Sequence, residues 1–177
     1  MSELRIIMVC MGNICRSPAA EVVLRHKLDA AGIDWVQVDS AGTGGWHEGD
    51  GADPRSQSTW ERRGYAGNHI ARQFRREWFD ERDLILVMDS DNYETLLSRT
   101  TQPEHHAKVR YLRSYDPALA DVEGADALEV PDPYYGGPQG FERMLDLIER
   151  ACDGLIPRLQ ALSAFGSSSS KSVDGPG

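Results

Sequence analysis

Apolar residues are grouped in two ways along this chain, and the two kinds of group alternate. Short runs that are apolar at almost every position span residues 4–9 and 84–88, which is typical of strands buried on both faces. A stretch over residues 20–31 carries apolar residues three or four positions apart, which is typical of a helix that covers a sheet. This alternation predicts an α/β fold in which a small open parallel sheet has helices on both faces.

The same patterns predict further elements. Two more strands are expected over residues 35–40 and 109–112, and further helices over residues 53–63, 75–79, 89–98 and 141–159. The strand at 109–112 is expected at an edge of the sheet, because its apolar residues alternate with polar ones. Pro157 lies inside the last apolar stripe, so we expect it to kink or divide that helix.

The chain has the size of one domain. Its 177 residues can bury a substantial core, and the sequence contains no internal repeat. From Gly166 onward the composition is dominated by serine and glycine, which is typical of disorder. We therefore predict one domain over residues 1–163, followed by a disordered tail over residues 164–177.

The segment between the first strand and the first helix carries the strongest chemical signal. It reads Cys-Met-Gly-Asn-Ile-Cys-Arg-Ser-Pro over residues 10–18. Ligands of open parallel sheets bind beyond the carboxyl ends of strands, and the amides of a loop ahead of a helix bind anions. We expect Cys10 to attack a bound phosphoryl group as a thiolate while Arg16 grips the phosphate oxygens. Ser17 and Pro18 are expected to begin the helix as N-cap and first residue.

Charge and cysteine content exclude several classes of function. A formal net charge of −9 argues against bulk nucleic-acid binding, and the apolar runs are too short to predict a membrane span. Three cysteines form no disulfide framework, so a cytoplasmic protein is expected. No cofactor and no metal are expected, because the adjacent His105 and His106 are poorly placed to converge on one ion.

The loop CMGNICRSP, together with DPYYG at residues 132–136, resembles the low-molecular-weight protein tyrosine phosphatase family. The similarity covers residues 4 to 162 approximately and includes the stretches VDSAGT, NHIARQ, VMDSDN and SYDP. This resemblance implies a four-stranded parallel sheet in the order 2-1-3-4. It also implies that Cys10 is the nucleophile, Arg16 the phosphate ligand and Asp132 the general acid. A group that supports the loop by hydrogen bonds is implied as well, and it comprises Asn13, Ser17, Ser40 and His69.

Other residues are expected to surround the substrate. The loop positions that would contact phosphate are Met11, Gly12, Asn13, Ile14, Cys15 and Ser17. We favour Trp46 and Tyr134 as aromatic walls around a phenyl ring, with internal packing as the alternative. Asp89 follows the third apolar strand, and it is expected either to cap a helix or to contact the loop.

Cys15 introduces the possibility of redox regulation. It lies five residues after Cys10 in a loop that curls around one anion, which can bring the two sulfur atoms within bonding range. A reversible disulfide between them would protect Cys10 from irreversible oxidation. The alternative is that Cys15 only fills space behind the loop.

These observations predict an enzyme that hydrolyses phosphotyrosine through a cysteinyl-phosphate. Its partner would be a tyrosine-phosphorylated protein, such as a tyrosine kinase or a substrate of one. A thiol-dependent arsenate reductase shares the fold but needs further cysteines after the third strand, and residues 88–151 contain none. A phosphoarginine phosphatase is the second alternative; that branch resembles this chain but carries threonine where Ile14 stands. The bulkier apolar side chain favours a phenyl phosphate.

Overall fold

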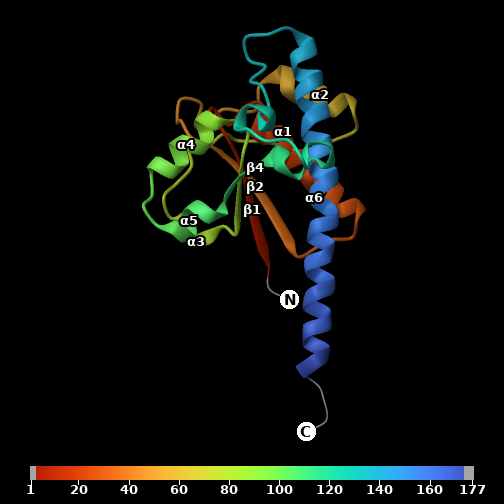
Figure 1. Cartoon of the computed structure of the whole chain (residues 1–177). Coiled ribbons are helices and arrows are strands. Elements are labelled where there is room, and N and C mark those ends of the chain that lie inside the picture. Colours follow the sequence, from red (N-terminus) through yellow and green to blue (C-terminus); the bar gives the residue numbers. More distant parts are fainter. Residues whose placement is uncertain (1–2, 174–177) are drawn as a thin grey trace.

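The computed structural model describes the backbone of residues 3–173 and the side chains of residues 3–163. The described residues form one parallel sheet in the order β2-β1-β3-β4 (Figure 1). Its strands are β1 (Leu4–Cys10), β2 (Val36–Gly42), β3 (Leu84–Val87) and β4 (Val109–Tyr111). The order implied by the family resemblance is confirmed, as is the edge position of β4.

Helices cover both faces of the sheet, as predicted. They are α1 (Arg16–Ala30), α2 (Pro54–Arg62), α3 (Trp78–Glu81), α4 (Ser90–Ser98), α5 (Pro103–Lys108) and α6 (Pro138–Val173). Figure 1 shows α3, α4 and α5 on one side of the sheet and α1 and α6 on the other. Three 3₁₀ turns follow β4, at Leu112–Tyr115, Pro117–Leu119 and Ala125–Leu128. The helix α5 had not been predicted.

The two helical layers explain why β1 is apolar throughout. Alternate residues of a strand point to opposite faces, so Ile6 and Met8 join the core beneath α1 and α6. Ile7 and Val9 join the second core, beneath α3 and α4. All four side chains are fully buried. Because both faces of β1 are covered, the chain leaves the two helical layers at the carboxyl end of this strand.

The start of α1 differs from the prediction. The helix begins at Arg16 with Cys15 at the N-cap position, so Ser17 and Pro18 lie inside its first turn. Ser17 is not the cap because its hydroxyl is engaged by groups of the preceding loop, including the Cys10 sulfur at 2.9 Å. The expected starts of α2 and α4 agree with the structure, where Asp53 and Asp89 are the N-caps and each accepts a backbone hydrogen bond.

The last helix runs through Pro157 without interruption, so the predicted division is wrong, and the alternative of a kink stays a prediction. Leu155 and Leu159 are buried against the sheet on both sides of the proline, and this packing offsets the backbone hydrogen bond that proline cannot donate. The helix continues to Val173, since an existing helix adds residues without a new nucleus. This part of the predicted tail is therefore helical in the structure, whereas residues 174–177 lie outside the described residues. The domain boundary at residue 163 stays a prediction.

Candidate active site

A loop of five residues (11–15) joins β1 to α1 and forms the floor of a pocket. It is held against the end of β2, because the amides of Thr43 and Gly44 donate to the carbonyls of Cys10 and Met11 at 2.9 Å each. Gly42 permits this approach, since a Cβ atom there would lie 2.7 Å from the Met11 carbonyl oxygen. The loop is thus fastened to the sheet at its first residues.

The Cys10 side chain lies inside the curl of this loop, and 2% of the residue is exposed. Its sulfur accepts a hydrogen bond from the Asn13 amide at 3.3 Å. The Ser17 hydroxyl lies 2.9 Å from the same sulfur. Ser17 Oγ accepts from the Asn13 side-chain amide at 2.8 Å, and its own proton has the sulfur at 2.9 Å and the Ala41 carbonyl at 3.4 Å as acceptors, of which the sulfur is nearer. Two donors therefore converge on Cys10, which is an arrangement that stabilises a thiolate.

Asn13 holds the curl of the loop. Its backbone is in the left-handed region with φ of 58°, a conformation that asparagine tolerates better than most residues. The Asn13 side chain is fully buried, donating to Ser17 and Ser40 and accepting from the Arg72 amide at 3.0 Å. Ser40 in turn donates to Glu21 at 2.7 Å. Asn13 and Ser17 thus lie behind the loop and support it.

His69 contacts the same part of the loop from outside. Its Nε2 lies 2.6 Å from the carbonyl oxygen of Asn13, which can only accept, so Nε2 carries the proton. Burial lowers the pKa of His69 below its usual value, and the positive charge of Arg72 acts in the same direction. The hydrogen bond to Asn13 and the negative charge of Glu21 raise this pKa but do not outweigh burial. A neutral imidazole that donates one hydrogen bond suits a supporting role.

Arg16 is the buried cation of the site, with 2% of the residue exposed. Its Nη1 donates to Asp89 Oδ2 at 2.6 Å and to the Val130 carbonyl at 3.0 Å. Burial alone would lower the pKa of Arg16, but the neighbouring Cys10, Asp89 and Asp132 raise it above its ordinary value. Because Nη1 is occupied, Nη2 and Nε are the nitrogens that remain for phosphate oxygens.

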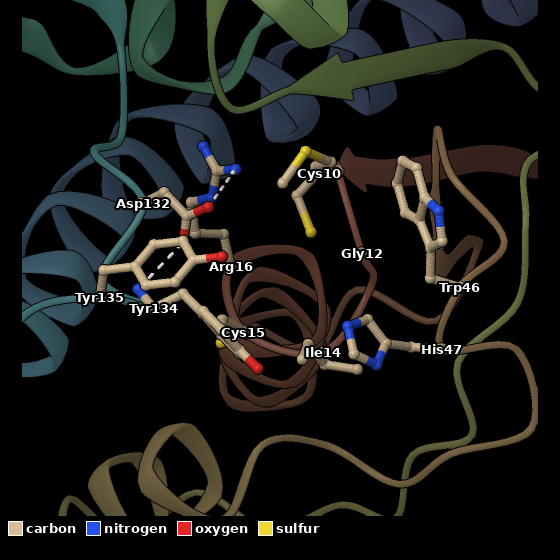
Figure 2. Close-up of a pocket in the computed structure, with 11 residues that line it drawn as sticks. Cys10, Gly12, Ile14, Cys15, Arg16, Trp46, His47, Asp132, Tyr134 and Tyr135 are labelled. Atoms are coloured by element: carbon tan, nitrogen blue, oxygen red, sulfur yellow. Dashed lines mark hydrogen bonds and ion pairs between the residues drawn. The ribbon is translucent and has the colours of Figure 1, made fainter.

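Asp132 lies opposite the loop at the pocket mouth. Its Oδ2 is 3.6 Å from Arg16 Nη2, as the dashed line in Figure 2 shows, and about a third of its side chain is exposed. The Tyr134 amide donates to the other carboxylate oxygen at 3.1 Å.

Asp89 has both of the roles that the sequence left open for it. Its carboxylate caps α4 and accepts a hydrogen bond from Arg16.

The pocket above the loop has a volume of about 370 Å³. Figure 2 shows Asp132, Tyr134 and Tyr135 on one side of Cys10, with Trp46 and His47 on the other. The structure thus brings Cys10, Arg16, Asp132, Trp46 and Tyr134 together around one pocket, and Tyr135 of the DPYYG segment lines it as well. His47 had not been predicted, and its position beside Trp46 is the signal in the sequence that indicates it.

Tyr134 is held from behind by a stacked arginine. The Arg55 guanidinium lies 5.3 Å from the centre of the Tyr134 ring and 4.8 Å from that of Phe141. Asp53 fixes Arg55 in turn through Oδ2, at 2.8 Å from Nη2. Trp46, by contrast, is 75% exposed. Tyr134 is therefore held in place by a neighbouring side chain, whereas most of Trp46 is exposed.

Cys15 is buried beneath the loop as a free thiol. Burial raises its pKa well above the usual range, and the negative charges of Asp53, Cys10 and Asp132 act in the same direction. Cys15 is therefore protonated at neutral pH. It is not the reactive sulfur of the site, although its proximity to Cys10 leaves a disulfide possible.

The part of the chain that the structure describes holds no group of three or more side chains placed to bind a metal ion. His105 and His106 bind different partners, since His105 contacts Asp80 and Thr100 whereas His106 contacts backbone carbonyls. Among residues 3–173, no helix combines the length and apolar character needed to cross a membrane.

Comparison with known proteins agrees with this geometry. The model of a family described as low molecular weight phosphotyrosine protein phosphatase matches residues 5–164. A low molecular weight protein-tyrosine-phosphatase of Streptomyces coelicolor is 50% identical over 153 residues, covering 86% of this chain and 91% of that protein. A crystal structure of a protein tyrosine phosphatase from Entamoeba histolytica aligns with a TM-score of 0.82 and 37% identity, covering 91% and 99% of the two chains. A Drosophila arginine phosphatase aligns with a TM-score of 0.78 and 28% identity, covering 88% and 98%.

The fold and the pocket define a cysteine-dependent phosphatase, a hydrolase with its nucleophile in a phosphate-binding loop. The chain belongs to the low molecular weight phosphotyrosine protein phosphatase family. The family resemblance of the loop and of the DPYYG segment is thereby confirmed. Membership in this family implies phosphoprotein substrates.

Proposed function

We propose that this enzyme hydrolyses phosphotyrosine in proteins through a cysteinyl-phosphate, with Asp132 as general acid. The observation that carries the proposal is the convergence of two hydrogen-bond donors on Cys10 at the bottom of a pocket that also contains Arg16 and Asp132. These are the groups that phosphate-ester hydrolysis requires, because the reaction is extremely slow without charge stabilisation and protonation of the leaving group.

The reaction begins with in-line attack of the Cys10 sulfur on phosphorus. The loop amides and Arg16 Nη2 would bear the negative charge of the equatorial oxygens. The bond from phosphorus to the phenolic oxygen breaks, and that oxygen takes a proton from the Asp132 carboxyl group. Asp132 then removes a proton from the water that cleaves the sulfur–phosphorus bond. Inorganic phosphate leaves, and Ser17 donates to the sulfur as its charge returns.

The pocket walls support an aromatic substrate. Tyr134 and Trp46 flank the space above Cys10, and Ile14 presents an apolar side chain at the floor. An aromatic ring between such walls gains contact area and stacking. The likeness to a protein named arginine phosphatase makes phosphoarginine the second candidate. We propose a tyrosine-phosphorylated protein of the reducing cytoplasm as the partner.

A substrate comparison tests this proposal. Matched peptides that carry phosphotyrosine, phosphoserine or phosphoarginine are assayed with the enzyme, and arsenate reduction is measured in parallel. We expect phosphotyrosine to be preferred, full activity in the presence of EDTA, and inhibition by vanadate. A preference for phosphoarginine, or arsenate reduction at a comparable rate, would replace the proposed function by the corresponding alternative.

Removal of the proposed acid should act selectively on poor leaving groups. Asp132→Ala is expected to lower kcat/KM for a phosphotyrosine peptide by about 10²- to 10³-fold, since general acids contribute on that order. The loss should be much smaller for an aryl phosphate with an acidic phenol, which needs little protonation. Asp121→Ala, at an exposed site in the same acidic segment, is the matched control. An equal loss on both substrates would contradict the assignment of Asp132.

Mild oxidation should link the two loop cysteines. Hydrogen peroxide would take two electrons from the pair, so that two thiols become one disulfide and two waters form. We expect two thiols to be lost together, with activity, and both to return after dithiothreitol. Cys15→Ser should lose activity irreversibly under the same treatment. Reversible inactivation of that variant at the wild-type rate would show that Cys15 only fills the loop.

A further inference from the structure

The backbone that leads to Asp132 is connected to the start of α4 by one glutamate side chain. Glu129 Oε1 accepts a hydrogen bond from Ser90 Oγ at 2.7 Å and lies 3.4 Å from the Ser90 amide. We propose that Glu129 is a positioning residue for the phosphatase reaction, which holds Asp132 in its working arrangement beside Arg16 through this contact. The inference rests on the proposed function, because it assumes that Asp132 protonates the leaving group.

The contact joins the two segments that bind Arg16. Ser90 directly follows Asp89, whose carboxylate accepts from Arg16 Nη1 at 2.6 Å. Glu129 directly precedes Val130, whose carbonyl accepts from the same nitrogen at 3.0 Å. The bond between Glu129 and Ser90 therefore closes a ring of contacts around Arg16. Loss of this bond would let the segment after Glu129 move, and with it Asp132, whose Oδ2 lies 3.6 Å from Arg16 Nη2.

The backbone on both sides of Glu129 is also held by hydrogen bonds that do not involve the Glu129 carboxylate. The effect of the carboxylate contact can therefore be tested separately. Arg113 Nη1 donates to the carbonyls of Ala127 and Glu129 at 3.1 and 2.7 Å. The Val130 amide donates to the Met88 carbonyl at 2.7 Å. These bonds attach the backbone to the end of β3 and to the turn after β4. Among residues 3–163, the hydrogen bonds between Glu129 and Ser90 are the ones that connect this segment to α4 through a side chain.

The hydrogen-bond directions make the Glu129 carboxylate the acceptor of the Ser90 proton. Tyr111 donates its hydroxyl proton to Ser90 Oγ at 3.2 Å, so the proton of Ser90 is directed to Glu129. The carboxylate also lies beside the first amide of α4, where a helix stabilises negative charge. A charged acceptor with an aligned donor makes a stronger and more rigid contact than a neutral pair.

Leaving-group dependence separates this positioning role from a purely structural one. Glu129→Ala is expected to lower kcat/KM by about tenfold for phenyl phosphate, because small displacements of a catalytic group are costly. For an aryl phosphate with a strongly acidic phenol the loss should stay within about twofold. The ratio kcat/KM is the useful quantity, since it reports steps up to departure of the phenol. Phosphate binding and the unfolding midpoint are measured alongside.

Conservative and paired variants complete the experiment. Glu129→Gln keeps an oxygen that accepts from Ser90, so it should restore most of the activity on phenyl phosphate. Ser90→Ala should reproduce the Glu129→Ala effect, and the double variant should lose no more than either single one. The exposed Glu123 supplies the matched control, Glu123→Ala, which should leave both substrates unaffected.

The outcomes distinguish this inference from the proposed function. The positioning role of Glu129 is overturned by Glu129→Ala activity that is unchanged, or that falls by the same factor on both substrates. Additive losses in the double variant would overturn it as well. Asp132→Ala is assayed on the same two substrates. If it shows no leaving-group dependence, the general-acid assignment fails, and the role of Glu129 fails with it for that separate reason.

Discussion

Cys10→Ser is expected to abolish turnover of phosphotyrosine while the loop keeps its ability to bind phosphate. A serine hydroxyl at the bottom of this pocket is a far weaker nucleophile than a thiolate, so we expect kcat to fall by at least about 10⁴-fold. Two donors that converge on the sulfur would instead contact the serine oxygen. The measurement combines turnover of a phosphotyrosine peptide with calorimetric titration of inorganic phosphate.

The fold should survive this substitution. Cys10 is buried, but the Asn13 amide and the Ser17 hydroxyl provide hydrogen-bond partners for a serine oxygen, so little unfolding free energy should be lost. Cys152→Ala is the control, because it removes a thiol from α6 that belongs to the core. That variant should lose stability and keep its turnover. Wild-type turnover by Cys10→Ser would exclude the cysteinyl-phosphate.

Much of the fold was predictable because the sheet imposes simple patterns on the sequence. A strand covered on both faces must be apolar at consecutive positions, and residues 6–9 satisfy this with two side chains in each core. The loop after that strand was predictable as well, since short-range spacing places Cys10 at its start and Arg16 six residues later, beside the beginning of a helix. The apolar strand and the loop after it were predictable because each depends on residues that are close together in the sequence.

The parts that could not be predicted depend on contacts between distant residues. Arg16 and Asp89 are 73 positions apart, and Val130 is 114 positions from Arg16. No local pattern indicates which carboxylate or carbonyl will meet a given guanidinium. Pro157 is a similar case, because whether it divides a helix depends on how the residues around it pack. The start of α1 was predicted wrongly because the Ser17 hydroxyl serves the loop.

Arg16→Lys is the second change with a very large expected effect, although it conserves the charge. The guanidinium uses Nη1 for Asp89 and Val130 and directs Nη2 to the pocket, and a lysine ammonium cannot span both sets of partners. The variant stabilises the charge of the transition state less well, so kcat/KM should fall by about 10³-fold for good and poor leaving groups alike. This uniform loss differs from the selective loss expected for Asp132→Ala.

Phosphate affinity and a surface control make the Arg16 test specific. Arg16→Lys should weaken the binding of inorganic phosphate, because lysine lacks the planar donors of the guanidinium, whereas Cys10→Ser removes no donor to the anion and should not weaken it. Arg25→Lys is the matched control, since Arg25 pairs with Glu21 in a half-exposed i,i+4 contact that contributes little. A lysine variant that keeps wild-type kcat/KM would show that loop amides alone stabilise the transferred phosphoryl group. The ring of contacts around Arg16 would then serve the fold and not the reaction.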